Sequence, residues 1–417
     1  MFKKITLKNY RTHKSTTLEL KPITLLIGNN SSGKTNFLSG IQHFSGLIKQ
    51  GNPFKEQNRT VQAKDYFSHR YRLASEEDTM SIEIEWSKNN HFVRYYLELY
   101  QNEKFLEKVG CREKLEFAVN LSENLQTLTN GYEPETDSIE MRLNLEKSEI
   151  LGNEEKELLN LFFKDCENIF SYHLQPSFLK GIIHDNLEID NILNQEIKIP
   201  AVLGNEGKNL QKLIYYIKTK EERVYSRFLA LMRRFADNRN FVGIRLNERK
   251  SKLLWEFDLG RTTTDRLLDE FPPEVISDGL LKAAAIALLV SIKNPPALML
   301  MEEIENGINP GNIQELIGWI WQATAPNQKD ISPQFILTSH SPSVLREFHQ
   351  NLDSVYTFRL NKRNYQSDVR NLNQALDTLI GIGTVEGDII EDEKTGNRRV
   401  EIPKYQLAEL WYSGTIG

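Results

Sequence analysis

The first 50 residues pass from a two-residue to a helical spacing of hydrophobic positions. Residues 2–9 and 15–20 alternate between apolar and polar side chains, which predicts two strands that pair with each other. Residues 22–27 form a short apolar run rich in β-branched side chains, the pattern of a buried strand. The next apolar residues recur every three or four positions: Phe37, Leu38, Ile41, Phe44, Leu47 and Ile48. This spacing predicts a helix with one buried face.

The middle of the chain carries both kinds of pattern. Residues 80–86 and 91–100 alternate, and they predict a hairpin that turns near residues 88–90. From residue 101 to 170 the chain is rich in Glu, Asn and Leu, with helical spacing near its end, and we interpret it as a lid or arm. Two amphipathic helices are predicted between residues 207 and 238.

The last third alternates helices with short buried strands. Residues 283–292 are almost wholly apolar and predict a buried helix, with Ser277 placed as its N-cap. Short apolar strands are predicted at residues 296–301, 334–338 and 355–360. Buried strands that alternate with helices are typical of an α/β fold.

Composition adds little to this picture but excludes several classes of protein. Hydrophobic residues make up 39% and charged residues 26% of the chain, as in soluble globular proteins. Cys111 and Cys166 are the only cysteines, too few for a disulfide framework or a cysteine-rich metal site. No apolar run reaches membrane-spanning length, and the N-terminus lacks the apolar core of a signal peptide. We therefore expect a cytoplasmic protein without a membrane partner.

The formal net charge of −5 gives no overall bias toward nucleic acid, so any such contact would be local. One basic cluster lies between Arg233 and Lys252. Its cationic residues are Arg233, Arg234, Arg239, Arg245, Arg249, Lys250 and Lys252. Two interpretations stay open: a solvated helix end with its hairpin, or a surface that contacts the phosphates of DNA.

Between the buried strand at 22–27 and the helix that follows lies a phosphate-binding loop of the form G-x-x-x-x-G-K-T. It comprises Gly28, Asn29, Asn30, Ser31, Ser32, Gly33, Lys34 and Thr35, and Asn36 directly follows it. The glycines permit backbone conformations in which successive N–H groups point at phosphate oxygens. Lys34 supplies a positive charge for the β- and γ-phosphates, and the Thr35 hydroxyl is a hard oxygen ligand for Mg²⁺. The loop and its flanks predict binding of ATP with Mg²⁺.

Three further short motifs follow in the last third of the chain. Glu302 and Glu303 come directly after a buried strand, and His340 follows the next strand. Parallel α/β sheets gather ligands at the carboxyl ends of their strands, so we assign Glu302 to the metal and Glu303 to the attacking water. His340 is assigned to a γ-phosphate oxygen.

The third motif is Ser277-Asp278-Gly279, in which Ser277 and Gly279 form a second anion site at a helix N-terminus. The helix behind it is too apolar to move, so we predict that this site takes the nucleotide of a second chain. The active unit would then be a homodimer, or a larger assembly of dimers, with ATP at the interface.

Taken in order, these motifs resemble the ABC-type P-loop ATPases of the RecF, SMC and OLD class. The segments that carry the resemblance are residues 5–11, 28–35, 277–279, 299–307, 337–342 and 410–414. The resemblance implies that Arg11, in an Asn-aromatic-Arg turn, binds the nucleotide. Ile304 and Asn309 stand where the class usually has proline and histidine, and Gln175 is a candidate for its Q-loop glutamine. The chain has no acidic cluster of a TOPRIM nuclease and no long heptad arm.

This resemblance implies an α/β fold, an ABC-ATPase-type P-loop domain with a mixed β-sheet flanked by helices and an inserted helical or lid region. We expect an ATP-binding lobe at 1–100, an inserted arm at 101–260 and a C-terminal ATPase lobe at 261–417. The expected function is a Mg²⁺-dependent ATPase that works as a dimeric clamp or sensor and controls a separate effector in an antiphage or toxin–antitoxin system. Two alternatives remain: a RecF-like DNA-repair ATPase and a scaffold that binds ATP without hydrolysis.

Overall fold

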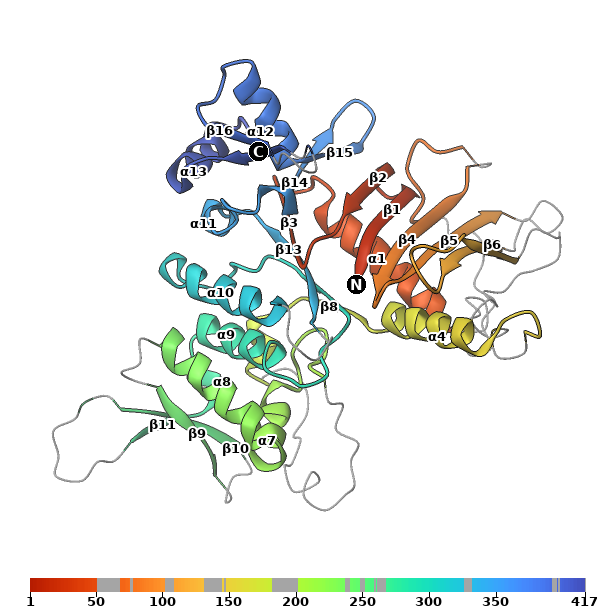
Figure 1. Ribbon diagram of the computed structural model, residues 1–417. Coiled ribbons are helices and arrows are strands. Elements are labelled where there is room, and N and C mark those ends of the chain that lie inside the picture. The colour runs from red at the N-terminus through yellow and green to blue at the C-terminus, as the bar shows by residue number, and fades with distance from the viewer. Residues whose placement is uncertain are drawn as a thin grey trace. The chain divides into compact units, whose positions relative to one another are not determined.

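The computed structural model divides into two compact units, which are described separately. It describes residues 1–50, 68–75, 78–101, 109–130, 145, 148–181, 202–236, 241–247, 252–258, 260, 268–325, 332–391, 396 and 398–416 (Figure 1). The first unit comprises residues 1–170, 297–300 and 334–417, and the second comprises residues 171–296 and 301–333. The predicted division at residues 100 and 260 stays a prediction.

The first unit contains an antiparallel six-stranded sheet in the order β2-β1-β4-β5-β6-β7. Its strands are β1 (Phe2–Tyr10), β2 (His13–Glu19), β4 (Met80–Lys88), β5 (His91–Gln101), β6 (Val109–Ala118) and β7 (Gln126–Asn130). The predicted pairing of β1 with β2 and the β4–β5 hairpin are both confirmed. Asn89 and Asn90 have φ of 50° and 68°, the left-handed conformations that a tight hairpin turn requires.

Strands β6 and β7 lie in the segment that the sequence predicted as a helical arm. Their residues instead extend the first sheet beyond β5. Glu113 interrupts the apolar alternation of β6 because it is fully buried, where it accepts hydrogen bonds from Tyr95 Oη (2.6 Å) and Asn130 Nδ2 (2.8 Å). The helix expected near the end of this segment is present as α4 (Asn153–Glu167), with Leu158, Leu159, Phe162 and Phe163 buried as its spacing predicts.

A second, mixed sheet has the order β15-β14-β3-β13-β12-β8. Its strands are β3 (Ile23–Gly28), β8 (Ile169–Tyr172), β12 (Leu298–Met301), β13 (Gln334–Ser339), β14 (Val355–Asn361) and β15 (Gln366–Asn371). β3 is parallel to β13 and β14, whereas β15 is antiparallel to β14. This arrangement confirms the predicted mixed sheet.

The helix that follows β3, α1 (Lys34–Gln50), packs against α4, and Ser45 Oγ donates to Cys166 O at 2.7 Å between the two helices. All six apolar positions predicted for this helix are buried in one core with residues of both sheets. Gln334 is buried in the same unit, where its side chain accepts from Phe2 N (3.0 Å) and donates to Phe2 O and Lys21 O (2.9 Å each). This glutamine therefore joins the first strand of one sheet to the other sheet.

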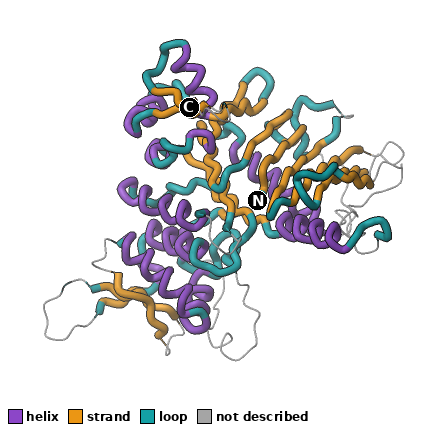
Figure 2. The backbone as a smooth tube through the Cα atoms, viewed as in Figure 1, coloured by secondary structure: helices purple, strands orange, loops and turns teal. Residues whose placement is uncertain are grey.

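The first unit ends in a small α/β region (Figure 2). Its elements are α11 (Pro342–Arg346), η3 (Leu352–Ser354), α12 (Leu372–Gly381), β16 (Asp388–Glu391), β17 (Arg398–Glu401) and α13 (Lys404–Tyr412). α11 packs against α13, and β16 pairs with β17 in an antiparallel ribbon.

The second unit is a group of helices with a three-stranded antiparallel sheet, β11-β10-β9 (Figure 1). The elements are α5 (Pro176–Leu179), α7 (Leu210–Lys220), α8 (Glu222–Phe235), β9 (Phe241–Asn247), β10 (Lys252–Phe257), β11 (Asp269–Phe271), η1 (Pro273–Val275), α9 (Asp278–Leu289), η2 (Pro310–Asn312) and α10 (Ile313–Thr324). Helices α5, α8 and α10 all pack on α9, whose residues from Leu281 to Leu289 are buried. The predicted buried helix and the two amphipathic helices are thus confirmed. Of the described helices, none has the length and apolar character needed to span a membrane.

Candidate nucleotide-binding site

The loop between β3 and α1 has backbone conformations that its two glycines permit. Gly28 has φ of 149° and Gly33 has φ of 105°, both in the region that favours glycine. A Cβ atom on Gly28 would lie 2.2 Å from the carbonyl oxygen of Phe358, and one on Gly33 would lie 2.0 Å from Ser367 Oγ. The neighbouring strands thus leave no room for a side chain at either position, and both glycines are required by packing as well as by the turn.

Lys34 holds its ammonium group inside the loop. Its Nζ donates to Gly28 O (2.7 Å), Asn29 O (3.0 Å) and Ser32 Oγ (3.3 Å). The residue is almost fully buried, and the first turn of α1 carries no acidic side chain. The ammonium charge and the partial positive charge of the helix N-terminus lie at the same place, which favours a polyanion such as a triphosphate.

The other loop residues present polar atoms to solvent. Asn29, Asn30, Ser31 and Thr35 are exposed, and Ser31 has φ of 61°. Thr35 stands at the start of α1, directly after Lys34, and its hydroxyl is the type of oxygen that Mg²⁺ prefers. The residues of this loop thus fit both the triphosphate and the metal that the sequence predicts.

Arg11 lies beside this loop, as the resemblance implied. Its Nη1 donates to Oδ1 of Asn36 at 3.3 Å, and Asn36 belongs to the first turn of α1. The backbone of Arg11 has φ of 49°, a left-handed conformation that turns the chain between β1 and β2. This turn brings the guanidinium group next to the residues that follow the loop.

His340 reaches the same edge of the mixed sheet. The register of β13 on β3 pairs Ser339 with Ile27, so His340 stands level with Gly28, where the loop begins. Within the first unit, the structure thus places Arg11 beside Asn36 and His340 at the end of the strand next to β3.

A rear wall of three side chains supports the loop, and sequence reasoning missed all three. Ser367 Oγ donates to Ser32 O at 2.7 Å and lies 2.7 Å from Thr12 Oγ1. His13 Nε2 lies 3.0 Å from Gly33 O. Only the position of His13, two residues after Arg11 of the Asn-aromatic-Arg turn, could have signalled a contact with the loop.

His13 is fully buried and neutral. Its Nε2 faces a carbonyl oxygen, so Nε2–H donates to Gly33 and Nδ1 accepts from Thr16 Oγ1 at 2.9 Å. Burial lowers the pKa of His13 to about 4, and the hydrogen bond to Gly33 opposes this shift. The imidazole is therefore a fixed support of the loop at neutral pH.

In the second unit, the predicted anion site lies at the start of α9. Ser277 is its N-cap, and its Oγ accepts from Leu280 N at 3.4 Å, as predicted. Ser277 is exposed, whereas the body of the helix is buried. A Cβ atom on Gly279 would lie 2.4 Å from Gly307 O, so the segment after Glu303 passes directly against this first turn.

The two predicted carboxylates lie at the end of β12. His173 Nδ1 is 4.0 Å from Glu302 Oε2, so the stretch that holds the candidate Gln175 runs beside the carboxylate assigned to the metal. Glu303 has φ of 46°, which is strained for a residue other than glycine. Its Oε2 accepts a hydrogen bond from Asn306 Nδ2. The second unit thus brings Glu302 and Glu303 close to the Ser277 motif.

The described arginines of the basic cluster make local contacts. Arg233 donates twice to Val242 O, and Arg234 forms a two-pronged ion pair with Glu315 (3.0 and 3.1 Å). Arg245 is paired with Glu256 (3.6 Å) and with Glu270. Arg239, Arg249 and Lys250 lie outside the described residues. These contacts favour the interpretation as a solvated face.

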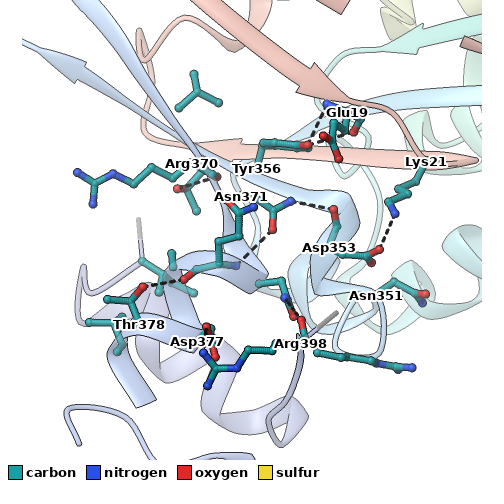
Figure 3. A pocket seen from close by; sticks show the side chains of 18 of the residues that line it. Glu19, Lys21, Asn351, Asp353, Tyr356, Arg370, Asn371, Asp377, Thr378 and Arg398 are labelled. Carbon is teal, nitrogen blue, oxygen red and sulfur yellow. Dashed lines mark hydrogen bonds and ion pairs between the residues drawn. The ribbon is translucent and has the colours of Figure 1, made fainter. Parts of the chain in front are cut away.

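A cavity of about 1680 Å³ lies in the first unit, lined by residues of β14, β15, α12 and their surroundings (Figure 3). Its lining carries charges of both signs, and two ion pairs lie among them: Lys21 with Asp353 (2.9 Å) and Arg398 with Asp377 (2.9 Å). Asn371 Nδ2 donates to Asp353 O at 2.8 Å across it (Figure 3). The cavity therefore shows no preference for an anionic or a cationic ligand.

The strand-loop-helix cradle in a mixed sheet defines an α/β P-loop domain of the ATPase type. Residues 23–346 match the model of the AAA_21 family, described as "AAA domain, putative AbiEii toxin, Type IV TA system", and the chain belongs to this family. The match and the mixed sheet confirm the predicted P-loop ATPase domain.

The chain is also similar to solved SMC head domains. These are the head domain from Thermotoga maritima (13% identity, 89% of this chain and 98% of that chain, TM-score 0.43) and an SMC head bound to the C-winged helix domain of ScpA (16%, 90% and 99%, 0.45). A third is an SMC head with an extended coiled coil bound to the C-terminal domain of ScpA derived from Pyrococcus furiosus (14%, 91% and 99%, 0.42). Among curated protein sequences, none matches this chain.

Proposed function

We propose that the chain hydrolyses ATP to ADP and phosphate with Mg²⁺. The observation that carries this proposal is the cradle formed by Gly28, Gly33 and Lys34, which places an ammonium group and a helix N-terminus around one anion site. Glu303 takes the proton of the water that attacks the γ-phosphorus, and the bond to the β-γ bridging oxygen breaks. Thr35 and Glu302 would hold Mg²⁺, which would supply positive charge against the triphosphate. His340 donates to a γ-phosphate oxygen.

Two substitutions test this assignment. Lys34→Met should abolish ATP binding measured by calorimetry, because the loop loses its charged phosphate contact. The matched control is Lys49→Met, an exposed lysine at the other end of the same helix, which should bind ATP like the parent. Glu303→Gln should still bind ATP but lose turnover by a factor on the order of 10² or more. If Glu303→Gln hydrolyses ATP at the parental rate, Glu303 is not the base that takes the proton of the attacking water. A parent protein without turnover would favour the non-hydrolysing scaffold.

We further propose that the active unit is a homodimer with ATP between the loop of one chain and the Ser277 motif of the other. Support comes from α9: Ser277 and Asp278 at its start are exposed, whereas its body is fixed in the core of the second unit. A two-fold axis lets each chain give and receive the same contact. The γ-phosphate would hold the dimer closed and hydrolysis would open it, which shifts the population that a partner meets.

Mixing two inactive variants tests the shared site. In a mixed dimer of Ser277→Arg and Lys34→Ala, one composite site carries both defects and the other carries neither. Recovery of part of the ATPase activity supports sites shared between chains. If subunits exchange and the mixture stays inactive, the dimer proposal is wrong.

The family description names a type IV toxin–antitoxin system. We propose that the ATPase controls a separate effector in a toxin–antitoxin or antiphage system. Affinity purification of the chain with the product of the neighbouring gene tests this role, with Lys34→Met as the nucleotide-free control. A complex that forms with the parent and changes with ATP supports an ATP-gated sensor. The RecF-like alternative requires DNA to stimulate turnover. Arg234 and Arg245, which are paired with glutamates, and Arg233, which donates to a backbone carbonyl, do not favour it.

A further inference from the structure

A buried lysine connects α9 with the segment that follows β12. Lys282 is 4% exposed and lies one helical turn after Gly279. Its Nζ donates to Glu303 O at 2.6 Å and to Asn306 O at 3.1 Å. Burial lowers the pKa of Lys282 to about 8, while the charges of Glu305 and Glu303 oppose this shift. A buried ammonium group is costly unless it is hydrogen-bonded, so these two carbonyls are the reason it is tolerated.

The first turn of α9 touches the same segment at a second point. Gly279 approaches Gly307 so closely that a Cβ atom would lie 2.4 Å from its carbonyl oxygen. The turn from Glu303 to Gly307 is therefore held on one side by a steric contact and on the other by the lysine. A shift of the first turn of α9 cannot leave this segment in place.

Glu303 depends on this support because its own conformation is strained. Its φ of 46° is of a kind that persists only where surrounding contacts impose it. Asn306 closes the turn, since its backbone N–H donates to Glu303 O at 3.0 Å and its side chain donates to the Glu303 carboxylate. Lys282 thus fixes the backbone, and Asn306 fixes the side chain, of the proposed water-polarising residue.

We propose that Lys282 is a positioning residue through which the first turn of α9 controls the orientation of Glu303. This inference rests on the proposed function. A nucleotide bound to the second chain would contact Ser277 and Gly279 of the first chain. Lys282 would pass this contact on to the Glu303 carboxylate, which acts on the nucleotide bound to the first chain itself. Each composite site then reports to the other by a direct contact within one unit, and turnover becomes cooperative in ATP.

The test measures kcat, KM and the Hill coefficient of ATP hydrolysis, with ATP affinity from calorimetry. Lys282→Met keeps the apolar stem and removes the donor, so kcat should fall at least about tenfold with unchanged ATP affinity, and the Hill coefficient should fall toward one. Lys282→Arg should restore part of kcat because it keeps a donor. The control is Lys218→Met, which removes a lysine that donates to Ile244 O away from this segment, and it should leave all four values unchanged.

Asn306→Ala is a second variant at an exposed position, and it keeps the proposal testable if Lys282→Met does not fold. It should lower kcat in the same way without changing ATP affinity. Parental kcat in a folded Lys282→Met or Asn306→Ala protein overturns the inference. An inactive parent overturns the proposed ATPase function instead, so the two failures are distinguishable.

Discussion

Ser367 offers the sharpest test of how the phosphate-binding loop keeps its shape. It lies on β15 and is 2% exposed, and its hydroxyl donates to Ser32 O at 2.7 Å from behind the loop. Ser367→Ala removes this donor without adding any atom to a crowded place. The carbonyl of Ser32 then lacks its buried partner, and the contact with Thr12 is lost as well.

The size of the effect follows from that lost partner. An unsatisfied buried carbonyl costs about 1–3 kcal/mol. Without nucleotide the loop can relax and expose this carbonyl to water, whereas the bound triphosphate requires the cradle shape. The cost therefore falls on the bound form, and the affinity for ATP should drop by roughly 5- to 150-fold.

Calorimetry of ATP binding measures this drop, and a second serine controls for lost stability. Ser354 is 1% exposed and its Oγ donates to Asn351 O at 2.6 Å, but it lies in η3 and makes no contact with the loop. Ser354→Ala should lower the melting temperature about as much as Ser367→Ala while binding ATP like the parent. Equal ATP affinities of parent and Ser367→Ala would refute the view that the rear wall shapes the loop.

Three further predictions concern stability and nucleic acid. Burial lowers the pKa of His13 and His43 to about 4, below the value in the unfolded chain. Stability should therefore be lost as pH falls from 6.5 to 4, by up to ~3 kcal/mol for each histidine. Urea unfolding at pH 7 and at pH 4.5 should show this loss. His13→Gln should show a smaller loss, and an equal loss would assign the acid sensitivity elsewhere. Gln334→Leu should destabilise the first unit by about 2–4 kcal/mol in urea, because it removes all three hydrogen bonds of a buried side chain at once. A loss under about 1 kcal/mol would contradict this role. Because Arg234 is already paired with Glu315, we predict that DNA affinity does not fall steeply with salt concentration in binding titrations. A steep salt dependence that corresponds to several phosphate contacts would restore the DNA-contact interpretation.

The sequence predicted the elements whose pattern is local. The strand, loop and helix from residue 22 to 48 are all confirmed, because each residue there reports its own environment: apolar in the strand, glycine at the turn, apolar every third or fourth position in the helix. The β4–β5 hairpin was predictable for the same reason, since two asparagines tolerate the left-handed turn that joins the strands.

Strands escaped prediction where a polar residue is buried or an apolar face is lacking. β6 was missed because Glu113 occupies a core position, where Tyr95 and Asn130 satisfy it. β15 was missed because Asp368 and Arg370 leave it with little apolar character on either face. Periodicity measures the hydrophobicity of a face, so it fails wherever burial is achieved by hydrogen bonds instead.

Contacts between distant parts of the chain are the remaining gap, and they decide how the site works. Ser367 and Ser32 are separated by 335 residues, and the pairing of β15 with β14, and of β14 with β3, brings them together. The motif residues could be predicted because phosphate chemistry restricts which residue types can serve there. A supporting serine or lysine has no such restriction, since many side chains could donate one hydrogen bond to a carbonyl. Sequence therefore identifies the groups that face the nucleotide, whereas the groups that hold them in place, such as Ser367 and Lys282, become visible only in the fold.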